Sequence, residues 1–470
     1  MTLKRALILL VATVLSACGS SHKLLGRVTV TPTVSSAYLF SNVNVFDGDA
    51  ALGSRDVLVR DGKVVAVAEG GTLKAEAGDE QIAGNGLTLM PGLIDSHAHL
   101  ESHGEAIWDI GFPKLDDIAQ TYLYAGVTTT LVMTGNEEHR KMEQQAAAGK
   151  QMLPRLYRTG KRLTAPDGFP MNLMRAILIW PLSSMVINGA MVGATTREEA
   201  WAAVDEAADK LAPPFFKITS DAFPPGTPKL SSEAMVAAIQ HSKQRGMRPT
   251  AHVGAPEDVM IAAEAGLELF AHPPSSATFT PEQLTRLAEL KIPFVSTQRF
   301  LTATNHMAAD QGSALDREVV APEMLAKFSH PPKDFKYPTV PADFDADALL
   351  KKYEGNLRAN VLALWTAGVP IFVGTDAGSP GVIPGASIHR ELVMLVAAGI
   401  PVIDVLKAAT SAPADFLDKE KSYGRVAPGQ RADLVLVKGD PTVEISATAS
   451  IVEVFQAGRK LTRTIGAVKD

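Results

Sequence analysis

The sequence predicts an α/β protein: a (β/α)8 TIM barrel with a small β-sandwich domain that both ends of the chain build. The first observation is the alternation of short apolar strands with alanine-rich helices over 91–421, which predicts parallel pairing and, with this many units, a closed barrel. The second is that both chain ends contain short apolar stretches typical of β-strands. The third is that no glycine-rich phosphate loop follows a strand, which disfavours the alternative of an open doubly wound sheet.

The composition is that of an ordinary globular protein. The chain has 470 residues, 46% of them hydrophobic, and 45 basic against 51 acidic residues give a net charge of -6. Because there is no basic excess, we do not expect nucleic acid as a partner. The single cysteine excludes an intramolecular disulfide and a zinc site made of several cysteines.

The amino-terminal sequence predicts a secretory leader. Two basic residues precede an apolar run over Ala6–Leu15, which is too short to span a membrane. The next residues, Leu-Ser-Ala-Cys, resemble the bacterial lipobox, so we expect a leader over 1–17, a lipid on Cys18 and a polar tether over 18–36. A plain signal peptide with a chance cysteine is the alternative. Because Gly19 is not an aspartate, we expect the anchor in the outer membrane of the bacterial cell envelope, facing the periplasm.

The two chain ends, 37–90 and 422–470, are expected to pair into the one β-sandwich domain. Alternating valines around Asp61-Gly62 are typical of a β-hairpin. The carboxyl-terminal end has a similar residue pattern, with an apolar strand over Ala432–Val437. The barrel is therefore expected between them, over 91–421.

Two segments of the barrel, Thr164–Gly193 and Arg299–Lys351, are too long for simple connections. Long excursions on a barrel often serve as lids or binding loops. The apolar stretch Met171–Val192, which includes Trp180, indicates either a wall of the substrate site or a contact with a second subunit of a homo-oligomer. The sequence favours neither.

Histidines end several predicted barrel strands, where barrel enzymes place their chemistry. His97 and His99 lie two positions apart after an apolar strand, so both side chains point the same way and together can chelate a divalent metal. His252, His272 and Asp376 end three further predicted strands. For any one histidine a hydrogen-bonded core position is the commoner explanation. Four histidines and an aspartate together indicate a metal centre.

Lys217 lies inside the apolar run Pro214–Ile218, where an unpaired lysine would be costly. Burial lowers the pKa of a lysine, and a neutral amine can react with carbon dioxide to give a carbamate. Such a carboxylate has two oxygens and can bridge two cations. A lysine that leaves the barrel or pairs with an acid is the alternative.

Four motifs then point to a known family: Met90–Asp95 leading into His97 and His99, Ala125–Thr129, Gly374–Gly378, and Gly424–Leu434. With them the sequence resembles the amidohydrolase superfamily, metal-dependent hydrolases built on a (β/α)8 barrel with a flanking β-domain. The resemblance covers nearly the whole chain after Ser36. It is greatest to the binuclear branch with imidazolonepropionases, Xaa-Pro dipeptidases, N-acyl amino acid hydrolases and ochratoxin-type amidases.

The resemblance implies two divalent metal ions, most often zinc. The first would be bound by His97, His99 and Asp376, and the second by His252 and His272. Lys217, as N6-carboxylysine, would bridge them.

The implied reaction is hydrolysis of an amide bond in a small molecule, such as an N-acyl amino acid or dipeptide, by a hydroxide that bridges the metal ions. Asp376 would be the catalytic residue that accepts a proton and passes it to the leaving group. His139 is a candidate for stabilising the oxyanion or contacting substrate. Arg162 and Arg299 are candidates for a carboxylate clamp, because the chain lacks the Gly-Gly-His segment that many members carry after the third strand.

Three alternatives remain open. A mononuclear deaminase of the same superfamily typically has a glutamate three positions after the histidine of the fifth strand, where this chain has Ala255. A cyclic amide or lactone hydrolase would use the same ligands. A lipoprotein whose barrel only binds a ligand is the non-catalytic alternative.

Overall fold

The computed structural model describes residues 26–30, 37–111, 113–307, 312–335 and 345–465. The predicted leader over 1–17 and the predicted lipidation site, Cys18, lie outside these residues. Within the described part of the chain, no helix is both long enough and apolar enough to cross a bilayer.

Eight parallel strands close into the predicted barrel. In ring order they are β7 (Leu93–Ala98), β8 (Val127–Val132), β9 (Arg155–Arg158), β12 (Phe215–Ser220), β13 (Arg248–Val253), β14 (Leu269–Phe270), β15 (Phe294–Val295) and β16 (Ile371–Phe372). Parallel ladders join β7 to β9 and β12 to β16. The bridges Thr159↔Phe215 and Ala98↔Ala377 join the two runs into one ring.

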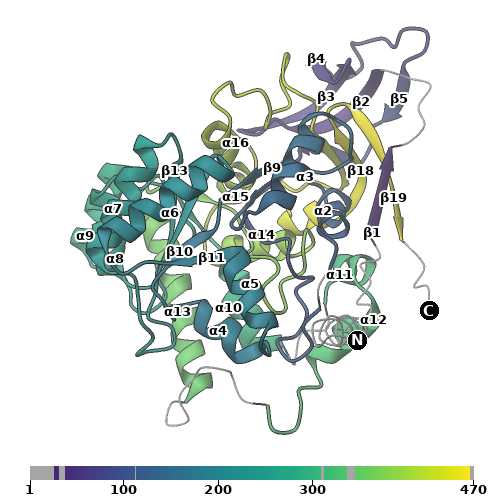
Figure 1. The fold of residues 1–470 in the computed structure, drawn as a ribbon. Coiled ribbons are helices and arrows are strands. Elements are labelled where there is room, and N and C mark those ends of the chain that lie inside the picture. The colour runs from purple at the N-terminus through teal and green to yellow at the C-terminus, as the bar shows by residue number, and fades with distance from the viewer. Residues whose placement is uncertain (1–25, 31–36, 112, 308–311, 336–344, 466–470) are drawn as a thin grey trace.

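Helices cover the outside of this barrel (Figure 1). They are α2 (Leu115–Tyr124), α3 (Glu137–Ala147), α6 (Arg197–Lys210), α7 (Ser232–Gln244), α8 (Pro256–Glu264), α9 (Pro281–Leu290), α13 (Ala346–Thr366), α14 (Ser387–Ala397), α15 (Val402–Ala408) and α16 (Ser411–Leu417). Local sequence sets their ends: a reciprocal capping box between Thr196 and Glu199 starts α6. The outward side chains Leu163 and Ile218 pack in the core between strands and helices.

The two chain ends pair with each other, in one nine-stranded sheet where a β-sandwich is predicted, and Figure 1 shows them side by side in purple and yellow. Its strands are β1 (Gly26–Val30), β2 (Ala37–Phe46), β3 (Ala51–Arg60), β4 (Lys63–Glu69), β5 (Glu80–Ala83), β6 (Leu87–Pro91), β17 (Leu434–Lys438), β18 (Ile451–Gln456) and β19 (Arg459–Ile465). A 3-10 turn, η2 (Ile445–Ala449), precedes β18. Only Gly92 separates β6 from β7, and a Cβ there would lie 2.2 Å from Thr128 Oγ1, so the connection requires glycine.

The structure corrects two details of the sequence prediction. Residues Gly26–Val30, within the predicted tether, form β1 and pair antiparallel with β19. His272 and Asp376 are predicted to end strands, but β14 and β16 are only two residues long and stop at Phe270 and Phe372, and β15 is equally short. Beyond β15 and β16, Thr297 and Asp376 have left-handed φ values of 42° and 56°.

The amino-terminal half of the barrel interior is filled with apolar side chains. Ile94, Leu131 and Leu269 belong to this cluster. Phe416 of α16 packs against it, with ring centroids 5.3 Å from Phe372 and 6.1 Å from Phe215. Solutes can therefore reach the barrel axis only from the carboxyl ends of the strands.

The two predicted insertions form small elements at one edge of the molecule, with α4, α5 and α10 at the bottom of Figure 1. The first contains β10 (Arg162–Thr164), α4 (Met171–Ile177), α5 (Leu182–Ala190) and β11 (Met191–Gly193). The second contains α10 (Gln298–His306), α11 (Ala314–Val319) and α12 (Pro322–Phe328). Strand β10 continues the third barrel strand, since Leu163 is in register with Ile218 of β12.

Candidate metal centre

The structure brings His97, His99 and Asp376 together at the junction of β7 and β16. Asp376 Oδ1 lies 3.2 Å from Nε2 of His97 and 3.2 Å from Nε2 of His99. Within the described chain these three form a group whose ligand atoms lie within 4.8 Å of one another. Backbone bonds from Asp376 N to His97 O (2.8 Å) and from His99 N to Ala377 O (2.8 Å) hold the two segments in place.

The hydrogen bond on the far side of His97 determines which of its nitrogens is free. Nδ1 lies 2.8 Å from the carbonyl oxygen of Ala271, which can only accept, so Nδ1 carries the hydrogen. Burial lowers the pKa of His97 to about 4, which favours the neutral ring with a lone pair on Nε2. Burial acts to raise the pKa of Asp376, but the neighbouring His97 and His99 outweigh it and keep the pKa well below its usual value. Oδ1 of Asp376 and the Nε2 atoms of both histidines converge at 3.2 Å, an arrangement that suits a cation bound by all three.

The same argument holds for the second pair of histidines. Nε2 of His272 and Nδ1 of His252 face each other at 2.6 Å. The other nitrogen of His272 lies 3.0 Å from the carbonyl oxygen of Pro273, and that of His252 lies 2.8 Å from Oδ2 of Asp221, so these outer nitrogens carry the hydrogens. Burial lowers the pKa of His272 to about 3 and that of His252 well below its usual value. Two lone pairs therefore point at one another, which again fits a divalent cation.

Lys217 lies near both sets of ligands, since a charge on it would act on His97, His252 and His272. The residue is 2% exposed, and its Nζ has no hydrogen-bond partner among the described residues. Burial, followed by the charge of Arg162, lowers the pKa of this lysine well below its usual value. Both effects favour the neutral amine, the form that reacts with carbon dioxide.

Several residues that position the ligands have no role in the sequence prediction. Asp95 accepts hydrogen bonds from Thr375 N (3.0 Å), Thr375 Oγ1 (2.6 Å) and His97 N (3.1 Å), which ties β7 to the loop that carries Asp376. Burial raises the pKa of Asp95 to about 7, although these hydrogen bonds oppose the shift. Thr134 Oγ1 lies 3.0 Å from Nδ1 of His99. Asp221 could have been found from the sequence, because it directly follows β12 at the carboxyl end of the barrel.

Of the three predicted substrate contacts, Arg162 lies closest to the ligand sets. Its Nη2 donates to Thr134 Oγ1 at 3.4 Å, and Thr134 in turn contacts His99. Its charge acts on Lys217 and His252. Among the described residues, no carboxylate forms an ion pair with this guanidinium, and its Nε is buried without a hydrogen-bond partner.

The other two predicted contacts have partners within the protein. His139, on α3, is buried with Nδ1 at 2.9 Å from Oδ1 of Asn136 and Nε2 at 3.4 Å from Oε1 of Glu101. Arg299, at the start of α10, donates from Nη2 to the carbonyl oxygen of Gly381 at 3.0 Å. Its backbone N–H donates to Glu391 at 2.7 Å. Arg299 thus ties the second insertion to the loop after Asp376.

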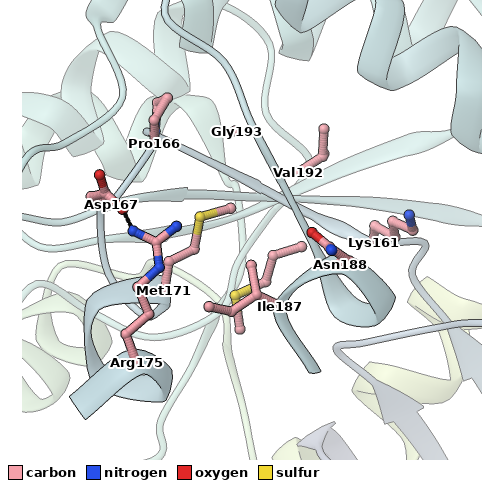
Figure 2. Close-up of a pocket in the computed structure, with 10 residues that line it drawn as sticks. Lys161, Pro166, Asp167, Met171, Arg175, Ile187, Asn188, Val192 and Gly193 are labelled. Carbon is pink, nitrogen blue, oxygen red and sulfur yellow. Dashed lines mark ion pairs between the residues drawn. The ribbon is translucent and has the colours of Figure 1, made fainter. Parts of the chain in front are cut away.

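The first insertion contains a cavity of about 500 Å³. Figure 2 shows Met171 and Ile187 in its middle, the Asp167–Arg175 ion pair at one side and Lys161 at the other. None of the predicted metal ligands lines this cavity. The nearby turn exposes Trp180, with 77% of its surface accessible, which leaves both sequence interpretations of this segment as predictions.

Comparison with known proteins supports the fold and identifies the family. No curated protein matches the sequence. Solved structures of similar fold include a Xaa-Pro dipeptidase with bound methionine in the active site (TM-score 0.71, 20% identity, 90% of this chain and 99% of that chain). Others are a molinate hydrolase (TM-score 0.69, 17% identity, 91% and 94%) and the A. niger ochratoxinase (TM-score 0.66, 18% identity, 91% and 95%).

The family model described as "Amidohydrolase family" matches residues 88–465, which include the barrel, the carboxyl-terminal strands and every predicted ligand. This match spans far more than half of the chain. The chain therefore belongs to the amidohydrolase family and is a hydrolase that acts on carbon–nitrogen bonds.

Proposed function

We propose that this protein is a binuclear metal-dependent hydrolase that cleaves an amide bond of a small molecule, such as an N-acyl amino acid or dipeptide. The observation that carries the proposal is the convergence of possible ligand atoms, Asp376 with His97 at 3.2 Å and His252 with His272 at 2.6 Å. A buried lysine amine without a hydrogen-bond partner, its pKa lowered by burial, supports a bridging ligand. These features suit divalent cations such as zinc and serve no evident purpose without them.

The ligand assignment follows from the two sets. His97, His99 and Asp376 would hold one ion, and His252 and His272 the other. Lys217 would add its amine nitrogen to carbon dioxide and release one proton, which gives N6-carboxylysine with an oxygen for each ion. When bound, the ions supply a lowered pKa for water and polarisation of the scissile carbonyl.

Asp376 is the residue that we propose moves the proton. Its pKa is kept well below the usual value, so it is ionised and can accept a proton at neutral pH. A proton held on its carboxylate can then pass to the leaving nitrogen, which departs as a neutral amine. Asp95 and Thr375 hold the loop that carries Asp376, so the direction of this carboxylate is set before substrate binds.

We expect Asp376→Asn to lower kcat by roughly 100- to 10,000-fold, the usual contribution of general acid–base catalysis. The measurement is hydrolysis of a panel of dipeptides, N-acyl amino acids and lactones with added zinc, with circular dichroism as the folding control. Unchanged turnover in the variant would remove Asp376 from catalysis. If the wild-type protein binds solutes but hydrolyses no member of the panel, the non-catalytic alternative is correct.

Lys217→Met tests the bridging role, because methionine keeps the length of the side chain and removes the amine. We expect metal content and activity to fall together, with activity at least ~100-fold lower, the scale of losing a main electrostatic contribution. Metal analysis of the purified variant and the same hydrolysis assay give the two readouts. If both survive, Lys217 does not bridge the ions.

The unpaired guanidinium of Arg162 supports recognition of an anionic group on the substrate. Arginine suits a carboxylate because its planar fork can donate two parallel hydrogen bonds. We expect Arg162→Gln to raise KM by about 10- to 100-fold for substrates with a free carboxylate, from the loss of one charged hydrogen-bonding group. Matched substrates with an amidated carboxyl group should show little change. An equal rise in KM for the free-carboxylate and the amidated substrates would mean that Arg162 does not bind the carboxylate.

We also propose that Cys18 anchors the protein to the outer membrane, with the hydrolase in the periplasm. The support is the lipobox-like Leu-Ser-Ala-Cys run behind a short apolar leader. Replacing Cys18 with serine should move the protein from the membrane fraction to the soluble periplasmic fraction and abolish labelling with a radioactive fatty acid. Membrane association that persists in Cys18→Ser would contradict the anchor.

A further inference from the structure

Three aromatic rings from separate segments form a continuous row that ends on His252. Phe169 lies between β10 and α4, Phe223 follows β12, and Tyr353 belongs to α13. The ring centroids are 5.8 Å apart between Phe169 and Phe223 and 5.7 Å apart between Phe223 and Tyr353. The Phe169 ring lies 5.2 Å from the imidazole of His252, tilted by 30°. We call these three side chains the aromatic wall.

Hydrogen bonds and apolar packing hold the aromatic wall in place. Thr164 Oγ1 donates to the carbonyl oxygen of Phe169 at 2.8 Å. Asn172 of α4 donates to the carbonyl oxygen of Phe223 at 3.3 Å, which ties the first insertion to the loop after β12. Tyr353 is buried in a satellite core between α10 and α13 that includes Leu301 and Leu357. The two insertions therefore build a preformed surface.

The part of the aromatic wall nearest the reactive groups is partly accessible. Phe169, Phe223 and His252 are each only partly buried. Partly exposed aromatic rings next to a buried polar centre gain most when an apolar group covers them. Arg162, at the start of β10, contacts Thr134 beside His99, whereas Phe169, which follows the same strand, contacts His252, so one segment brings both a guanidinium and an aromatic ring to the site.

We propose that the aromatic wall is a subsite for an aromatic or large apolar group of the substrate, placed on the His252 side of the scissile amide. This inference rests on the proposed amide hydrolase function and names the class of substrate. It assigns a role to Phe169 of the first insertion and to Tyr353, which follows the second. The substrate would be an amide with an apolar ring on one side of the molecule and an anionic group on another.

The test uses pairs of compounds that differ only in the presence of a ring. N-benzoylglycine and N-acetylglycine differ on the acyl side, and N-acetylphenylalanine and N-acetylalanine differ on the amine side. For the wild-type zinc enzyme we expect kcat/KM to favour the aromatic member of at least one pair by about 10-fold or more, the range of a hydrophobic pocket. Calorimetric binding of the matching products, benzoate against acetate and phenylalanine against alanine, should show the same preference without turnover.

Phe169→Ala and Phe223→Ala should each reduce the aromatic preference at least ~5-fold, because the apolar contact with the ring is lost. Phe169→Leu, which keeps apolar volume, should retain more of the preference than Phe169→Ala. Trp201→Ala is the matched control, since this aromatic residue is 40% exposed on the outer helix α6. Metal content and circular dichroism should match the wild type.

The outcomes separate this inference from the proposed function. Absence of aromatic preference in both product and substrate pairs, or a preference that survives both alanine variants, would overturn the subsite. A protein that hydrolyses none of the amides but binds benzoate or phenylalanine selectively through Phe169 would contradict the hydrolase function and support the subsite.

Discussion

The structure depends on possible metal-ligand atoms that are held facing one another at the mouth of the barrel. The histidines are fixed by acceptors on their far sides: the carbonyl oxygens of Ala271 and Pro273 hold the outer hydrogens of His97 and His272 away from the centre. Asp221 does the same for His252. Without a cation the facing lone pairs of His252 and His272 repel each other, and with one the repulsion becomes coordination. The arrangement of the barrel mouth follows from this need.

Apolar side chains close one end of the barrel, and the ligands lie at the other end. Apolar side chains around Ile94 and a covering Phe416 fill the amino-terminal half, so buried polar groups collect at the carboxyl ends of the strands. The hydrogen bonds of Asp95 to Thr375 join the first and last strands where the ring closes. Burial of that carboxyl is costly, as its raised pKa of about 7 indicates. The hydrogen bonds that Asp95 accepts offset part of this cost, and they hold His97 and Asp376 close together.

The fold and the ligand types could be predicted from the sequence because each follows a periodic rule. Strand–helix alternation predicts the barrel, and the end of each strand predicts where His252 and His272 lie. Asp221 could have been noticed from its place directly after β12, but its contact with His252 depends on tertiary structure that the sequence pattern does not encode. Strand β16 likewise ends at Phe372, before the predicted ligand Asp376, where the chain has a left-handed φ. Phe169 reaches His252 through the tertiary packing of an insertion, which no local pattern encodes.

The most direct test of the binuclear account is anomalous diffraction from crystals grown with zinc and bicarbonate. We predict two peaks about 3.5 to 4 Å apart, as in other two-metal sites, one beside His97, His99 and Asp376 and one beside His252 and His272. Density for a carboxyl group on Nζ of Lys217 should lie between them. A single peak at the first set, with Lys217 unmodified, would contradict the account.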